Sequence, residues 1–309
     1  MRTTLRSLSS GSADARVLAR LQSQLPRLYS HTFEQFEPVW RAATTAVVAD
    51  APAVVVDLAS GLGEPACSLA RRFPHAEIVA SEAEEGMLAL CRERVAAKGL
   101  AHRVGVHQID LLDLHALAAP GAETLQCDVV TCSLALYMVA PAAQGPCLDG
   151  IKALLRPKGQ LVATVWDRFP LFDLGERCLA AATRGTALAD SAPAGLPFSP
   201  TSLGNGHADA LLASAGLRPG PRHNERGSMR LSLGALDDDE TWMRALLPFM
   251  GALAEAAQSP QADGRVFERA RAAFDAEAAA LDFLTPHGPY SKEHVELDLE
   301  FRLISVLKP

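Results

Sequence analysis

The chain has 309 residues, 49% of them hydrophobic, and a formal net charge of -7 at pH 7. The hydrophobic fraction is sufficient for a sizeable core and excludes bulk disorder, while the negative net charge argues against an extended basic surface for nucleic acid. No apolar run approaches the ~20 residues of a membrane span, so we expect no nucleic-acid partner and no membrane span. The six cysteines show no metal-binding spacing, so we expect buried, reduced thiols and no metal site.

The first thirty residues allow two interpretations. Arginine and serine are frequent in residues 1–30 and Asp14 is the only acid, which is the composition of an organelle transit peptide. Leu18, Leu21 and Leu25 recur at helical spacing, which is typical of an ordinary amphipathic helix. We therefore expect a cytoplasmic protein, with a mitochondrial or other organelle location as the alternative.

Strands and helices are expected to alternate through the first half of the chain. A helical segment over residues 13–49 comes first. Strands are then expected at 53–58, 77–81, 104–109, 128–132 and 160–165, with helices at 64–73, 85–98 and 147–155. This alternation predicts an α/β fold with a doubly wound, mostly parallel sheet.

Beyond residue 167 the alternation is lost. Residues 184–206 are rich in alanine, glycine, proline and serine and are expected to form a long loop. A helix at 207–215, a sixth strand at 217–223, helices at 239–257 and 264–284 and a last strand within 295–307 are expected to follow. We divide the chain into an N-terminal helical segment (1–49), a cofactor-binding core (50–170) and the rest of the sheet with a helical cap (171–309), together one compact unit.

The stretch from Val54 to Pro65 predicts a nucleotide site. A β-branched run ends at Asp57, small residues follow, and Pro65 suits the first turn of a helix. Residues 61–66 satisfy the dinucleotide pattern G-x-G-x-x-G/A. Glu82 lies nineteen residues after Gly63, at the end of the next expected strand, where a carboxylate can accept hydrogen bonds from both ribose hydroxyls. NAD enzymes and S-adenosylmethionine enzymes both use such a carboxylate.

Five stretches occur in order between residues 50 and 170, at 55–63, 79–88, 110–114, 127–137 and 154–159. In these stretches the chain resembles the class I S-adenosylmethionine-dependent methyltransferases, in the small-molecule branch that includes the ubiquinone/menaquinone-biosynthesis type. The resemblance implies a Rossmann-like sheet of seven strands with a helical insertion before the last. It also shows one departure, because Ala59 stands where many members carry their first glycine.

The resemblance implies S-adenosylmethionine as the cofactor and assigns roles to residues around it. Asp57 would order the loop and hold the methionine ammonium, Glu82 would bind the ribose, and Ser133 would line the sulfonium side. The other expected contacts are Ala59, Gly61 and Gly63 around the methionine part, and Met87, Asp110 and Leu111 around the adenine. Met87 as plain core, Asp110 as a helix cap and Glu82 as a solvated carboxylate stand as the alternatives.

The reaction implied by the resemblance is an in-line displacement that moves a methyl group to a small-molecule acceptor. Tyr29, Tyr137 and Trp166 are the expected acceptor-side residues, with His207, His223 and His287 as further polar candidates. No catalytic residue is assigned, and the acceptor and the oligomeric state are left open. A non-catalytic protein that retains the fold and an NAD-dependent oxidoreductase are the alternative functions.

Overall fold

The computed structural model of the chain describes residues 13–117, 125–184, 199–204, 206–235, 238–260, 262–280 and 294–309. Their contacts form two compact units, each drawn from three separate segments. Unit 1 contains the described parts of 1–35, 169–197 and 230–299, and unit 2 those of 36–168, 198–229 and 300–309. We expected one compact unit built from three consecutive segments; the functions assigned to those segments stay predictions.

Unit 1 is mainly helical. Its described helices are α1 (Ala13–Glu34), α7 (Pro170–Thr183), α10 (Thr241–Ala245), the 3-10 helix η2 (Leu247–Phe249), α11 (Met250–Ala257) and α12 (Val266–Ala280). The buried Asp14 carboxylate accepts hydrogen bonds from the backbone N–H groups of Val266 and Phe267, at 3.0 and 2.9 Å. The first turn of α1 therefore caps the N-terminus of α12.

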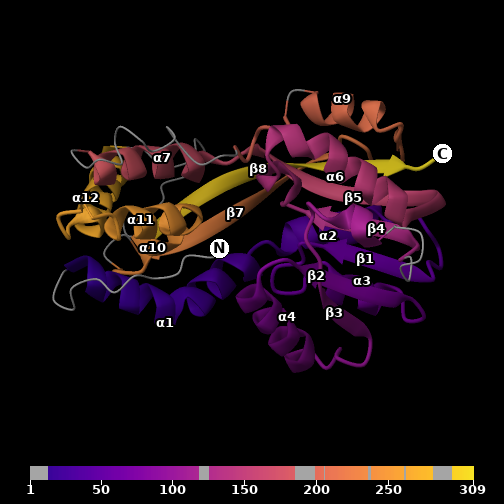
Figure 1. Cartoon of the computed structure of the whole chain (residues 1–309), viewed down its shortest axis with the longest axis horizontal. Helices are drawn as coiled ribbons and strands as arrows, with labels where there is room; N and C mark the ends of the chain where they lie inside the picture. The colour runs from indigo at the N-terminus through magenta and orange to yellow at the C-terminus, as the bar shows by residue number, and fades with distance from the viewer. Residues whose placement is uncertain are drawn as a thin grey trace. The chain divides into compact units, whose positions relative to one another are not determined.

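Unit 2 is built on a parallel sheet. The strands β1 (Val54–Leu58), β2 (Glu77–Glu82), β3 (Val104–Gln108), β4 (Cys127–Ser133) and β5 (Leu155–Arg168) lie in the order β3-β2-β1-β4-β5 (Figure 1). β8 (His294–Leu307) then pairs antiparallel with β5, with Gln160 opposite Leu307 and Thr164 opposite Leu303. This order confirms the predicted α/β fold with a mostly parallel sheet.

The expectation of seven strands was wrong, because the sheet has eight strands in the described part of the chain. The expected strand at 217–223 is reduced to β6 (Arg218–Pro219), and a further strand, β7 (Arg226–Ala235), also pairs with β8. Pro219 and Pro221 lack the N–H group that a ladder needs, so the chain turns between the two strands. The alternation of Met229, Leu231 and Leu233, all buried, is the signal for β7 that the sequence reasoning missed.

Helices of unit 2 cover both faces of its sheet. Alternate residues of a strand point to opposite faces, and two separate cores follow from this. One holds Val55, Val129 and Val162 with α2 (Glu37–Ala46), α3 (Ala66–Arg72) and α4 (Glu85–Ala97). The other holds Val56, Val130 and Leu161 with α5 (Leu114–Leu117), the 3-10 helix η1 (Leu136–Met138), α6 (Pro141–Leu154) and α9 (His207–Ser214). The sheet is therefore doubly wound, as predicted.

Several element boundaries differ from the expected ones. The helix expected over 13–49 is interrupted at Gln35 and Phe36, just before Pro38, and the one expected over 239–257 is interrupted at Pro248. Both breaks follow from the missing N–H and fixed φ of proline. The helix α7 was not expected at all, and most of the expected loop at 184–206 lies outside the described residues. All six cysteines are free and buried, as predicted.

Candidate functional site

Asp57 lies at the carboxyl end of β1 and is completely buried. Its Oδ1 accepts a hydrogen bond from the Thr131 hydroxyl at 2.6 Å, and its Oδ2 accepts one from the Ala66 N–H at 3.2 Å. Burial raises the pKa of Asp57 to about 7, against the opposing effect of hydrogen bonds from Thr131, Ser60 and Ala66. Asp57 thus fixes the turn between its own strand, β4 and the start of α3.

The turn that follows β1 depends on left-handed backbone conformations. Ala59, Gly61 and Gly63 have φ angles of 52°, 56° and 89°. Glycine adopts these angles without strain, whereas the Cβ of Ala59 makes them costly. A Cβ at Gly63 would lie 3.2 Å from Val95 Cγ2 and 3.3 Å from Cys91 Sγ, so the turn also packs tightly on α4.

Glu82, the last residue of β2, closes the turn from the neighbouring strand. Its Oε2 accepts from the Gly61 N–H at 3.0 Å, and its Oε1 accepts from the Ala83 N–H at 3.1 Å. Burial raises the pKa of Glu82, and these backbone hydrogen bonds oppose the rise. Each carboxylate oxygen can accept a second hydrogen bond, so both retain capacity for hydroxyl donors.

The residues expected to contact adenine lie in the first turn of α4 and just after β3. Asp110 is exposed after β3, and its Oδ1 accepts from the Leu112 N–H at 2.9 Å, which makes a local side-chain turn rather than a helix cap. Leu111 is half-buried against the core on the α6 side. Met87 is half-buried in the first turn of α4, where its N–H donates to the Glu84 carboxylate at 2.8 Å. Their contacts with adenine stay predictions.

Tyr137 and Trp166 are brought together from η1 and β5. Their side chains share a hydrogen bond, and loss of hydration raises the pKa of Tyr137 to about 12. Trp166 also packs edge-on against Phe36, with ring centroids 5.7 Å apart. The two residues expected on the acceptor side of unit 2 therefore form one aromatic group.

The other candidates for the acceptor side, Tyr29 and three histidines, come from different parts of the chain. Tyr29 belongs to α1 in unit 1, where its ring stacks on Phe33 at 5.8 Å, and its role at an acceptor stays a prediction. His223 Nε2 lies 2.9 Å from the Asp209 carboxylate and its Nδ1 accepts from the Ser305 N–H, so it is held in a structural network. His207 is exposed in α9, and His287 lies outside the described residues.

The hydroxyl groups of Thr131 and Ser133 on β4 and of Thr164 on β5 complete the site. The sequence had indicated only Ser133. Thr131 bonds Asp57, whereas Ser133 Oγ and Thr164 Oγ1 are buried without a hydrogen-bond partner among the described residues. The spacing of Thr131 and Ser133, two residues apart on one strand, places them on the same face of the sheet. That spacing is the signal by which Thr131 could have been found.

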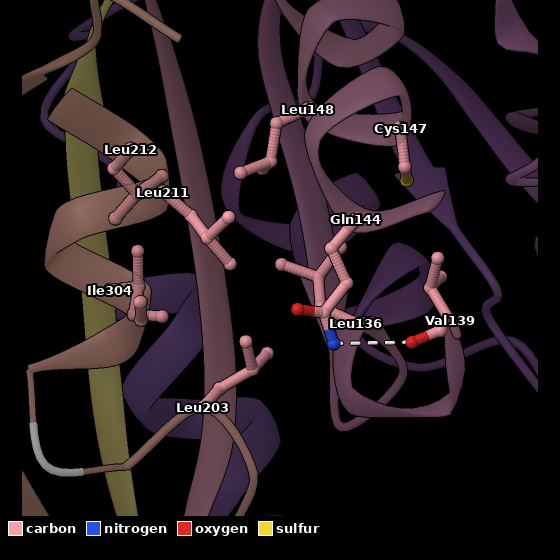
Figure 2. A pocket seen from close by; sticks show the side chains of 10 residues that line it. Leu136, Val139, Gln144, Cys147, Leu148, Leu203, Leu211, Leu212 and Ile304 are labelled. Atoms are coloured by element: carbon pink, nitrogen blue, oxygen red, sulfur yellow. Dashed lines mark hydrogen bonds between the residues drawn. The ribbon is translucent and has the colours of Figure 1, made fainter. Parts of the chain in front are cut away.

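A narrow apolar cavity lies behind η1 on the other face of the sheet. Figure 2 shows it between Leu148 and Cys147 of α6 and a group formed by Leu211, Leu212, Leu203 and Ile304. Gln144 is its polar member, and its Nε2 donates to the Val139 carbonyl at 3.1 Å. This bond fixes the end of η1, the helix that carries Tyr137.

The register brings the predicted donor residues to one edge. Asp57 is level with Ala80 of β2 and with Thr131 of β4, so the residues that follow on these strands meet at the carboxyl ends. There the turn, Glu82 and Ser133 lie on three adjacent strands, which is where ligands bind in open α/β sheets. Glu82 can accept further hydrogen bonds, and the Ser133 hydroxyl has no partner within the described ranges, so the two fit a ligand with ribose hydroxyls and a further polar part.

In the described part of the chain, no cluster of three metal-ligating side chains occurs. Within the same ranges, none of the helices combines the length and apolar character needed to cross a membrane.

Residues 55–159 match the methyltransferase domain family. The chain is similar to the demethylmenaquinone methyltransferase of Deinococcus radiodurans, with 35% identity over 122 residues that cover 40% of this chain and 46% of the relative. It is also similar to the demethylmenaquinone methyltransferase of Clavibacter sepedonicus, with 32% identity over 127 residues, 41% of this chain and 46% of the relative. The matches thus span about half the length of these relatives.

Among solved structures, the [4+2]-cyclase SpnF covers 98% of this chain and 99% of its own, with a TM-score of 0.51 and 15% identity, which shows the shared fold. Fold and sequence together define residues 55–159 as a methyltransferase domain of the Rossmann-like class. The resemblance to methyltransferases that was predicted from residues 50–170 is confirmed over residues 55–159.

Proposed function

We propose that the chain is an S-adenosylmethionine-dependent methyltransferase that acts on a small-molecule acceptor. The observation that carries this proposal is the Glu82 carboxylate, which is fixed by the Gly61 N–H at 3.0 Å within the part of the chain that matches the methyltransferase domain. This bond joins the glycine turn to the residue expected to bind ribose. The match to the domain and the position of this pair at the carboxyl edge of the sheet support the same function.

The donor would be held by residues of four segments. Glu82 would accept hydrogen bonds from the ribose hydroxyls, and Gly61, Gly63 and Ala59 would bring the backbone close to the methionine part. Asp57 would act through the turn, because its carboxylate is buried and bonded to Thr131 and Ala66. Met87, Asp110 and Leu111 would contact the adenine, and Ser133 the sulfonium side.

When bound, S-adenosylmethionine supplies an electrophilic methyl group on a sulfonium leaving group. The chain's contribution is then mainly the placement of the acceptor for in-line attack, which can lower the barrier by several kcal/mol. With a pKa of about 12, the Tyr137 phenol stays protonated near neutral pH. Tyr137 therefore orients the acceptor and does not remove its proton.

The acceptor is proposed to be small and partly apolar. The aromatic pair of Tyr137 and Trp166 suits a ring, because aromatic side chains pack favourably on one another. The relatives named demethylmenaquinone methyltransferases make a quinone-type ring one candidate. A cytoplasmic location stays a prediction, with an organelle as the alternative. The absence of a nucleic-acid partner also stays a prediction.

Binding of S-adenosylhomocysteine to the purified chain, measured by calorimetry, tests the proposal. We expect binding at micromolar ligand, and no binding at high micromolar ligand would refute the function.

Fluorescence titration with NADH tests the oxidoreductase alternative, because an NAD-dependent oxidoreductase would bind NADH saturably. A chain that binds S-adenosylhomocysteine but methylates nothing in a broad metabolite screen would favour the non-catalytic alternative.

The ribose role of Glu82 is tested with Glu82→Ala. Loss of two charge-assisted hydrogen bonds is expected to weaken S-adenosylhomocysteine binding by about tenfold or more. The matched control is Glu85→Ala, which removes the same charge from an exposed position near the start of α4 and is expected to leave the affinity unchanged. Equal affinity of the Glu82→Ala variant and the unmodified chain would remove Glu82 from the site.

A further inference from the structure

Of the buried side-chain hydroxyls in unit 2 that lack a partner among the described residues, two lie on adjacent strands of the sheet. Thr164 is completely buried and Ser133 is 7% exposed, and neither Ser133 Oγ nor Thr164 Oγ1 has a hydrogen-bond partner among the described residues. The nearby Thr131 hydroxyl, in contrast, donates to Asp57. Burial of an unbonded hydroxyl costs stability, and such groups are few in folded proteins, so each requires an explanation.

The two hydroxyls occupy one row of the sheet. Ser133 and Thr164 are register partners on the adjacent parallel strands β4 and β5, so their side chains lie on the same face. One step earlier, Leu58, Cys132 and Ala163 form the preceding row, which places Ser133 and Thr164 level with Ala59 of the glycine turn. The hydroxyls therefore lie at the edge where the donor is proposed to bind.

The backbone beside this row is held in a strained conformation. Leu134 follows Ser133 with a φ of 55°, although it is not glycine, and its N–H donates to the Thr164 carbonyl at 2.9 Å. Left-handed backbone at a branched-chain residue costs free energy and persists where the surroundings impose it, often at functional sites. Strain and two unsatisfied hydroxyls thus coincide at one point of the sheet.

The position of Thr164 indicates which reactant it would meet. β5 lies one strand further from β1 and β2 than β4 does, so Thr164 is removed from the turn and from Glu82. Trp166, two residues along β5 on the same face, carries the aromatic pair with Tyr137. A hydroxyl can both donate and accept a hydrogen bond, so it suits a neutral oxygen better than an ion.

We propose that Ser133 and Thr164 form a two-hydroxyl site that binds a neutral oxygen, a hydroxyl or a carbonyl, carried on the aromatic ring of the methyl acceptor. This inference rests on the proposed function and adds the chemistry of the acceptor to it. Thr164 is in this view a specificity-determining residue, whose unmade hydrogen bond is completed by the acceptor.

The test uses the full chain saturated with S-adenosylhomocysteine and 1-naphthol as the probe, with binding followed by calorimetry. Thr164→Val removes the hydroxyl at constant volume, and Thr164→Ser restores a hydroxyl. Thr44→Val is the matched control, because Thr44 Oγ1 is also buried and has no hydrogen-bond partner in the described part of the chain, but lies on α2. We expect Thr164→Val to weaken 1-naphthol binding by about fivefold to tenfold, with Thr164→Ser and Thr44→Val close to the unmodified chain.

Stability supplies a second readout that needs no ligand. Thr164→Val and Thr44→Val each remove a buried hydroxyl that has no hydrogen bond among the described residues. We therefore expect each variant to raise Tm by about 1–3 °C. A lower Tm for Thr164→Val would show that the hydroxyl is bonded in solution and would overturn the inference.

Three binding results would also overturn it: no 1-naphthol binding by the unmodified complex at low millimolar probe, equal affinity of Thr164→Val and the unmodified chain, or equal losses in Thr164→Val and Thr164→Ser. Failure of the proposed function is distinguishable, because it appears earlier as an absence of S-adenosylhomocysteine binding.

Discussion

Asp57 shows how one buried carboxylate couples the candidate site to pH. Its carboxylate is bonded to Thr131 and Ala66, yet burial still raises the pKa from 3.8 to about 7. The folded chain therefore holds this proton more tightly than the unfolded chain does. The stabilisation of the folded chain by this proton is complete below the pKa of Asp57 in the unfolded chain. It is lost as pH rises through the pKa of Asp57 in the folded chain.

We expect the contribution of Asp57 to the free energy of unfolding to fall by about 2 kcal/mol between about pH 5.5 and about pH 8. In Asp57→Asn, the side-chain oxygen can still accept from Ala66, the amide can donate to the Thr131 hydroxyl, and the group carries no titratable proton. Urea unfolding of both proteins across this range measures the effect, and their difference cancels the histidines common to both. Parallel pH profiles for the two proteins would contradict the prediction.

At the scale of elements, the packing of α7 depends on one glycine. An ideal Cβ on Gly175 would lie 2.1 Å from Cε2 of the completely buried Phe249, at the end of η2. Phe249 in turn packs against Phe172 of α7, with ring centroids 5.2 Å apart. Glycine is therefore required here by close approach of the two elements, and not by its backbone angles.

We expect Gly175→Ala to lower the free energy of unfolding by about 1–3 kcal/mol, because the added methyl overlaps the Phe249 ring. The control is a double-mutant cycle with Phe249→Leu, whose smaller side chain leaves room for the methyl group. The double variant is expected to be more stable than the sum of the two single losses predicts. Additive losses, measured by urea unfolding, would mean that the two residues do not interact.

At the scale of the whole molecule, each compact unit is assembled from distant segments. In unit 1, α1 and α12 are more than 200 residues apart, and Asp14 joins them through its bonds to Val266 and Phe267. Arg27 and Arg244 both pair with Glu240 in the same unit. Residues 13–34 are thus part of the packed structure of unit 1.

We expect Asp14→Ala to lower the free energy of unfolding by about 3 kcal/mol, since two buried N–H groups at the start of α12 lose a charged acceptor. Arg16→Ala, at an exposed position two residues further along α1, is the control and is expected to change stability by less than about 0.5 kcal/mol. Chemical denaturation measures both. A loss as small as that of the control would show that water replaces the Asp14 carboxylate.

The sequence by itself determined the features that depend on neighbours along the chain. The valine run before Asp57, the glycines after it and the position of Glu82 predicted a strand, a turn and a ligand carboxylate, and the structure has the turn bonded to Glu82. Proline positions also carried the signal for the breaks near Pro38, Pro219 and Pro248, although these elements were expected to be continuous. Such patterns act within a few residues, so they are visible without a fold.

Only the tertiary structure decided what meets across the sheet. Thr131 bonds Asp57 from a strand more than 70 residues away, and Ser133 and Thr164 share a row only because β4 and β5 pair in one register. The eighth strand and the two units likewise depend on contacts between distant segments. Side-chain spacing along the chain does not encode strand order or register, and those two properties place the hydroxyls of the site.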